Sequence, residues 1–134
     1  MVDLFKSVKV KEWFRLKGRE NLANALLNFY DCTDRPMGMY LIGSGIITDA
    51  NHSFLHILGL TLDELRSRYY IDFVHEEDRS RTMEVVNTIL KGGVFLNGFK
   101  NRWVVNGKTF YMTWNLVTIG GVTTFDVEIV SQLE

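Results

Sequence analysis

The stretch Arg102-Trp-Val-Val-Asn-Gly-Lys-Thr-Phe-Tyr-Met-Thr-Trp114 decides the fold, because it holds the strongest short hairpin signal in the chain. Asn106-Gly107 is a dipeptide preferred in tight turns, and apolar and β-branched residues flank it on both sides. We therefore expect strands over 94–105 and 108–119. Gly120-Gly121 then turns the chain into a third strand over 122–131, which completes an antiparallel meander.

The residues before the meander predict helices. A longer helix is expected over 77–91, with acidic residues at its start and Gly92-Gly93 as its stop. Thr61 and Glu64 form a capping box, so a short helix should begin at residue 62. Further short helices are expected over 53–58, capped by Asn51 or Asp49, and over 69–75. Two short strands, over 37–44 and 46–49, complete an α+β fold.

The N-terminal part is expected to be a separate extension. Residues 3–30 have a helical pattern, and residues 31–36 form a polar linker that contains the only proline. This extension either packs on the domain's own core or dimerises. We therefore expect an extension with linker over 1–34, a domain over 35–132, and a tag remnant at 133–134.

Composition excludes several classes of function. With 134 residues and 46% apolar residues, the chain predicts one globular domain. A net charge of −1 does not indicate the positively charged surface that nucleic-acid binding requires. No apolar run reaches the roughly 20 residues that span a bilayer, so no membrane segment is expected. The single cysteine, Cys32, leaves no internal disulfide and favours a cytoplasmic location.

Several short motifs, in order, resemble those of the PAS domain family. They are Pro36-Met-Gly-Met-Tyr-Leu-Ile42, Gly45-Ile-Ile-Thr-Asp-Ala-Asn51, Phe54-Leu-His-Ile-Leu-Gly59, Thr61-Leu-Asp-Glu-Leu65, Asp72-Phe-Val-His-Glu-Glu-Asp-Arg79 and Arg102 through Gly107. The likeness covers about residues 35–131. It implies a five-stranded antiparallel sheet flanked by short helices and one longer helix.

The resemblance also implies a function. PAS domains are sensory modules of larger signalling proteins, here a bacterial histidine kinase or a GGDEF-type diguanylate cyclase of a two-component or related system. No nucleophile with an adjacent base is recognisable, so this fragment is expected to be non-catalytic. The alternative is a cofactor-free PAS-like module for dimerisation, with the N-terminal helix forming the homodimer.

The family resemblance argues against two cofactors. In light-oxygen-voltage domains the reactive cysteine would fall at Ile71, which has no thiol, so covalent flavin photochemistry is excluded on this alignment. In oxygen-sensing haem PAS domains a histidine would follow the Arg79-Ser-Arg81 stretch, where this chain has Thr82. This departure argues against the oxygen-sensing type of haem, so haem is not expected by this route. Other haem PAS domains use a histidine nearer His75, and that alternative stays open. His52 and His56 share a helical face but lack further metal ligands in sequence, so no metal is expected.

The remaining expectation is a small-molecule pocket of a few hundred Å³ between the long helix and the meander. Helical periodicity turns Thr82, Val86 and Ile89 inward, with Met83 and Leu90 as further candidates. The flavin-type alignment places Arg102, and with it Val104, on the inner face. The candidate pocket residues are Thr82, Val86, Arg102, Met112, Trp114 and Phe125.

Arg102 is the informative member of this set. A guanidinium that faces an apolar pocket is costly without a partner. It therefore needs an internal carboxylate, a path to solvent, or an anionic ligand held bidentately.

Overall fold

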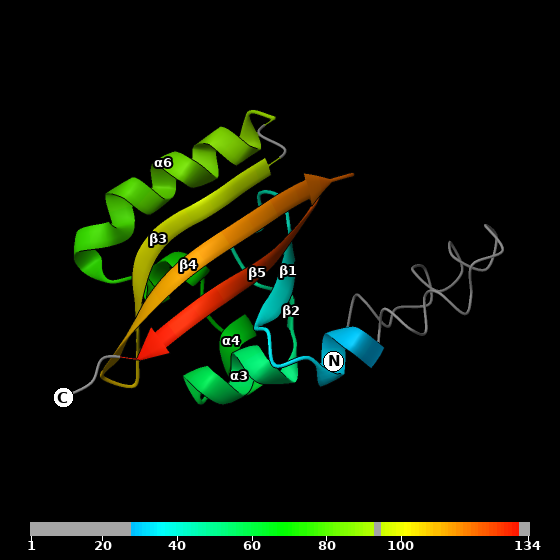
Figure 1. Ribbon diagram of the computed structural model, residues 1–134. Coiled ribbons are helices and arrows are strands. Elements are labelled where there is room, and N and C mark those ends of the chain that lie inside the picture. Colours follow the sequence, from blue (N-terminus) through cyan, green and yellow to red (C-terminus); the bar gives the residue numbers. More distant parts are fainter. Residues whose placement is uncertain (1–27, 93–94, 132–134) are drawn as a thin grey trace, which may run out of the picture.

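The computed structural model describes residues 28–92 and 95–131 (Figure 1). Most of the predicted N-terminal helix, including the face proposed for dimerisation, lies outside these residues, as do the expected strand start at Val94 and the pair 133–134. Residues 28–32 are helical and lead into the first strand through the predicted linker.

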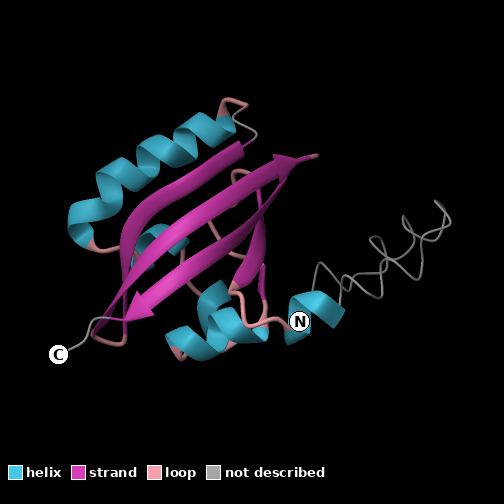
Figure 2. Ribbon diagram, in the orientation of Figure 1, coloured by secondary structure: helices cyan, strands magenta, loops and turns pink. Residues whose placement is uncertain are grey.

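Five strands form one antiparallel sheet in the order β2-β1-β5-β4-β3 (Figures 1 and 2). They are β1 (Met37–Leu41), β2 (Asp49–Ala50), β3 (Phe95–Val105), β4 (Lys108–Ile119) and β5 (Val122–Ser131). The last three are the meander predicted from the sequence, with the turns at Asn106-Gly107 and Gly120-Gly121.

The connection from β2 to β3 is helical. It contains α3 (His52–Leu58), α4 (Leu62–Arg66), α5 (Tyr70–Phe73), a 3₁₀ turn η1 (Glu76–Asp78) and α6 (Arg79–Leu90). Asn51 is the N-cap of α3, and the capping box of Thr61 and Glu64 begins α4, as the sequence predicts. The buried faces of these helices and the inner face of the sheet form one hydrophobic core.

The first hairpin departs from expectation. Strand β2 has two residues instead of the four expected over 46–49, and β1 ends at Leu41. The segment between them uses Gly43 and Gly45 at φ angles of +80° and +73°, which strand geometry does not allow. Ile47 is buried in the core, so its side chain is held by packing and not by a strand ladder.

The start of the long helix also differs. The expected helix over 77–91 begins as the 3₁₀ turn η1 and becomes α-helical at Arg79. The Nδ1 atom of His75 accepts a hydrogen bond from the backbone N–H of Glu77 at 3.1 Å, which caps this turn. This is the turn hydrogen bond that a histidine before an acidic helix start favours.

Aromatic rings fill the centre of the core between the helices and the meander. The ring of Trp103 stacks on that of Phe73, with centroids 5.0 Å apart and planes inclined by 7°. Phe54 of α3 meets Trp103 edge-on at 5.9 Å, and Trp114 and Phe125 meet at 5.0 Å. This cluster brings β3, β4, β5, α3 and α5 together, and a cavity lies beside it.

Candidate functional site

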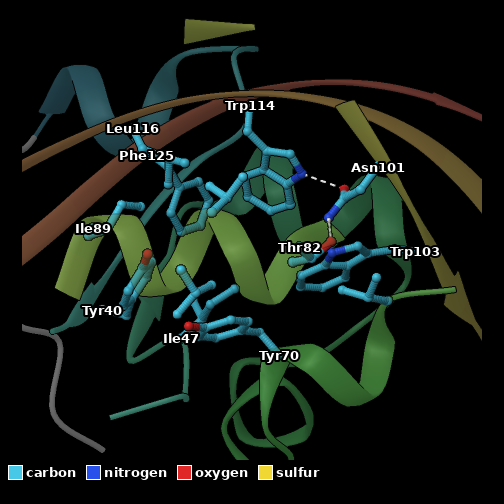
Figure 3. Close-up of a pocket in the computed structure, with 13 residues that line it drawn as sticks. Tyr40, Ile47, Tyr70, Thr82, Ile89, Asn101, Trp103, Trp114, Leu116 and Phe125 are labelled. Carbon is cyan, nitrogen blue, oxygen red and sulfur yellow. Dashed lines mark hydrogen bonds between the residues drawn. The ribbon is translucent and has the colours of Figure 1, made fainter. Parts of the chain in front are cut away.

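The cavity lies between α6 and the inner face of the sheet and has a volume of about 50 Å³ (Figure 3). From the strands it is lined by Tyr40, Asn101, Trp103, Trp114, Leu116 and Phe125. From the helices and loops it is lined by Ile47, Tyr70, Val74, Thr82, Val85, Val86 and Ile89. A volume of a few hundred Å³ was expected, and the observed space is comparable with that of a few water molecules.

One wall of the cavity is a chain of satisfied polar groups. The indole Nε1–H of Trp114 donates to Oδ1 of Asn101 at 2.7 Å. The Nδ2 atom of Asn101 donates to Oγ1 of Thr82 at 3.2 Å, and that hydroxyl donates to the carbonyl of Asp78 at 2.8 Å. Figure 3 shows the first two bonds as dashed lines. Because partners within the protein already hold these groups, they orient the wall instead of offering a catalytic acid or base.

Two tyrosines line the opposite side of the cavity. The rings of Tyr40 and Tyr70 have centroids 5.3 Å apart. Burial raises the pKa of Tyr40, and a hydrogen bond with Thr123 partly offsets this effect. Burial also raises the pKa of Tyr70, as does the neighbouring Tyr40. Both phenols are therefore neutral near pH 7, and no residue that lines the cavity carries a charge at that pH.

The structure places four of the six candidate residues around the cavity. Thr82 and Val86 come from α6, Trp114 from β4, and Phe125 from β5. Met112 is 1% exposed and lies on the same face of β4, but it packs in the core without lining the cavity. The outer candidates of α6, Met83 and Leu90, are 38% and 47% exposed and do not face this space.

The expected inward orientation of Arg102 is wrong. Asn101, Trp103 and Val105 are the buried residues of β3, so alternation along the strand turns Arg102 and Val104 to the other face. The alignment with flavin-binding relatives was therefore displaced by one residue on β3. An apolar inner face accepts the indole of Trp103 far more readily than a guanidinium.

Arg102 instead binds an internal carboxylate. Its Nε and Nη2 atoms donate to Asp78 Oδ2 at 3.0 Å and Oδ1 at 2.9 Å, and Nη2 also reaches Glu77 Oε2 at 3.1 Å. The backbone N–H of Arg102 donates to Asp78 as well, and its carbonyl accepts from His75 N at 2.8 Å. This network covers the free edge of β3 and fixes the start of α6 to the sheet.

The ion pair predicts a specific acid sensitivity. Hydrogen bonds from Arg102 lower the pKa of Asp78 from 3.8 to about 2. Because the folded pKa lies below the unfolded one, the pair stabilises the fold above about pH 4, and this contribution is lost as the pH falls toward about 2. We expect Asp78→Asn to remove about 1 kcal/mol of this pH-dependent stability, since water still reaches the guanidinium and screens the pair.

Urea unfolding at a series of pH values between about 2 and 6 measures this difference. Glu84→Gln, which neutralises an exposed carboxyl on α6, should leave the acid dependence as in the original protein. Equal slopes for Asp78→Asn and the original protein would show that the pair does not control this pH range.

Sequence reasoning missed Asn101 and left Trp103 out of the candidate pocket. Both line the cavity, and Asn101 is the central group of its polar wall. A signal was present: the set Asn101, Trp103 and Val105 is more apolar than the alternating set Lys100, Arg102 and Val104. The indole of Trp103 was a better guide to the inner face of this strand than the alignment that placed Arg102 there.

The residues considered as ligands of a metal or a flavin lie away from the cavity. His52 and His56 stack at 5.4 Å on an exposed face of α3. Within 28–92 and 95–131, no group of three or more histidine, cysteine or acidic residues is placed to hold a metal ion. Ile71, at the position of the flavin-reactive cysteine, borders a groove outside the cavity. No helix in this part of the chain is long and apolar enough to cross a membrane.

Comparison with protein families identifies the fold. The family model described as "PAS fold" matches residues 47–123, which is more than half of the 134 residues. The chain belongs to the PAS fold family. This PAS domain extends from the short β1–β2 hairpin through the helices to β5, and the family match includes eleven of the thirteen cavity-lining positions, the exceptions being Tyr40 and Phe125.

Solved structures agree on the architecture. One is a domain of a sensory box sensor histidine kinase/response regulator from Geobacter sulfurreducens, with a TM-score of 0.68 and 15% identity over 80% of this chain and 93% of that one. Another is the PAS domain of an HTR-like protein from Haloarcula marismortui, with a TM-score of 0.64 and 21% identity over 87% and 98%. No curated protein matches this PAS domain in sequence.

A third similar structure is a LOV protein from Rhodobacter sphaeroides, with a TM-score of 0.68 and 12% identity over 83% of this chain and 68% of that one. At these identities the three structures show a shared PAS fold. The five-stranded sheet and the helices between β2 and β3 thus have the arrangement that the motifs predicted.

Proposed function

We propose that this PAS domain is the sensory input module of a larger cytoplasmic signal-transduction protein, either a histidine kinase or a GGDEF-type diguanylate cyclase. It binds a small molecule between α6 and the sheet. The observation that supports this proposal is the cavity itself, which is lined by residues from β1, α5, α6, β3, β4 and β5. A molecule that fills the cavity therefore touches four of the five strands and the helices α5 and α6.

A route from the cavity to the N-terminal flank supports the sensory role. Phe125 lines the cavity, and the next residue, Asp126, points to the other face of β5. Asp126 accepts from the Arg35 guanidinium at 2.6 Å, and the N–H of Val127 donates to the carbonyl of Pro36 at 3.0 Å. A shift of Phe125 on binding would therefore be passed to the linker that precedes β1.

The test is native mass spectrometry of freshly purified protein, combined with an absorption spectrum. A small molecule that co-purifies and is retained in the native ion would support the sensory proposal, and its spectrum would separate haem and flavin from colourless ligands. The proposal would be contradicted if only the ligand-free chain were detected and if added candidate molecules changed neither its mass nor its NMR chemical shifts.

The size of the cavity favours a second candidate, a cofactor-free interaction module. About 50 Å³ is far below the roughly 300 Å³ of a typical ligand pocket, and aromatic rings fill most of the core. In this alternative the apolar residues of the N-terminal extension, such as Trp13 and Phe14, form a homodimer.

Sedimentation of the full chain tests the second candidate. A dimer that becomes monomeric in Trp13→Glu/Phe14→Glu, with an unchanged circular dichroism spectrum, would support it. A monomeric original protein at tens of micromolar would count against it.

A further inference from the structure

A second hollow lies directly outside the cavity. This groove has a volume of about 220 Å³ and runs between α6, the start of α5 and the β1–β2 connection. Tyr70 and Val86 line both the groove and the cavity. The two spaces are therefore separated by the side chains of these two residues.

The rim of the groove exposes large apolar side chains. Tyr69 is 58% exposed, Met83 38% and Leu90 47%. Met83 and Leu90 are the two further α6 candidates from the sequence pattern, and they do not face the cavity. Their position is explained if α6 presents two apolar faces, one toward the cavity and one toward the groove.

The wall between the two spaces can open without unfolding α5. The backbone N–H of Tyr70 donates to the carbonyl of Gly45 at 2.9 Å, which fixes the main chain at this point. The Tyr70 ring packs on Tyr40 with centroids 5.3 Å apart. Rotation of the Tyr70 side chain about χ1 would connect groove and cavity while the Gly45 hydrogen bond stays in place.

The residues that line the cavity and the groove indicate which kind of ligand could bind there. No aspartate, glutamate, lysine, arginine or histidine lines either space. An ion would lose its hydration there without gaining a partner, so a neutral molecule is favoured. Five aromatic side chains line the inner space and favour a flat ring that packs against them: Tyr40, Tyr70, Trp103, Trp114 and Phe125.

We propose that the groove is the entrance to the cavity and that the joined site takes a neutral, single-ring aromatic molecule. Because the cavity alone holds only a few water molecules, the ring takes the space beside Trp114 that the Tyr70 side chain leaves when it rotates, and a short substituent lies in the groove beside Met83. This inference rests on the proposed sensory function and adds the ligand class and the route of entry. Together the two volumes approach the lower end, about 300 Å³, of ordinary ligand pockets.

The probe pair is 4-methylbenzyl alcohol and 4-methylbenzoate, which share a shape and differ in charge. Titration is followed by ¹H–¹⁵N NMR at the indole Nε1–H of Trp114, because this group lies on the cavity wall and donates to Asn101. We expect the alcohol to shift this signal in a saturable way and the carboxylate to bind at least about tenfold more weakly.

Two pairs of variants test the entrance. Val86→Phe narrows the connection between the two spaces, and Asn87→Phe puts the same ring on an exposed neighbouring position of α6. Tyr70→Ala opens the wall, and Tyr111→Ala removes a tyrosine that is 45% exposed and lines neither space. We expect Val86→Phe to slow association of the alcohol at least about tenfold and Tyr70→Ala to accelerate it, with both controls like the original protein.

The outcomes separate the two proposals. If the alcohol shifts the Trp114 signal and associates at the same rate in Val86→Phe and Asn87→Phe, the groove is not the entry route. Binding of the alcohol in the cavity would still stand. If the carboxylate binds as tightly as the alcohol, the neutral ligand class is wrong. If neither probe shifts Trp114 in the original protein or in folded Val86→Phe and Tyr70→Ala, both the inference and ligand binding at this site are overturned.

Discussion

Replacing Asn51 with alanine is expected to destabilise the protein by about 3 to 5 kcal/mol, because several buried groups lose their partners at once. Asn51 is 1% exposed. Its Nδ2 atom donates to the carbonyls of Tyr30 and Arg35, both at 2.9 Å. Its Oδ1 atom accepts from the N–H groups of Met37 at 3.0 Å and Phe54 at 3.1 Å.

These bonds join three parts of the molecule through one side chain. The amide caps α3, holds the first residue of β1 and ties down the linker before it. Urea unfolding measures the loss of stability, and amide hydrogen exchange at Met37 and Phe54 shows where it acts.

Ser53→Ala provides the matched control. The Ser53 hydroxyl donates to the carbonyl of Asp34 in the same linker at 2.6 Å, but this bond is exposed. Its removal should cost less than about 1 kcal/mol. A similar small loss in Asn51→Ala would show that the linker is not held by the Asn51 amide.

Replacing Trp103 with alanine is expected to cost about 3 to 5 kcal/mol and to enlarge the candidate pocket. Trp103 is 1% exposed, stacks on Phe73 and meets Phe54 edge-on. It also lines the cavity, so removal of its indole joins a ring-sized space to the existing volume. An apolar void of this kind stays dry and can bind an aromatic molecule.

Thermal unfolding with and without indole tests this prediction. Indole should raise the midpoint of Trp103→Ala in a concentration-dependent way and by more than it raises that of the original protein. Trp103→Phe keeps a ring on Phe73 and should lose less stability and gain less from indole. Absence of rescue in a folded Trp103→Ala protein would mean that the core collapses into the space.

The two expected results concern different aspects of function. Asn51 fixes the linker before β1, which is the output segment in the proposed function, whereas Trp103 shapes the cavity, which is the proposed ligand site. A protein that loses linker protection in Asn51→Ala but keeps probe binding at Trp114 would show that the two tasks are separable.

Much of the fold could be predicted from the sequence. The turn at Asn106-Gly107, the N-cap at Asn51 and the capping box of Thr61 and Glu64 all depend on residues within a few positions of one another. Such local signals act in almost any tertiary context. The strand ranges of β4 and β5 were accordingly predicted to the residue.

The candidate site could be predicted only in part. Alternation placed Trp114 and Phe125 on the inner face correctly, because β4 and β5 lie inside the sheet with one face on the core. Strand β3 is an edge strand with a register shift between Asn97 and Phe99, so its two faces were harder to assign. Arg102 was assigned to the wrong face because the alignment with flavin-binding relatives, from which the assignment came, was displaced by one residue on this strand.

By itself, the sequence determined the order of the elements, their caps and turns, and membership of a recognisable fold family. The tertiary structure alone decided that Asn101 joins Trp114 to Thr82, that Arg102 pairs with Asp78, and that the cavity measures about 50 Å³. The physical reason is range: caps and turns are satisfied by near neighbours, whereas a face or a void depends on rings brought together from distant strands and helices.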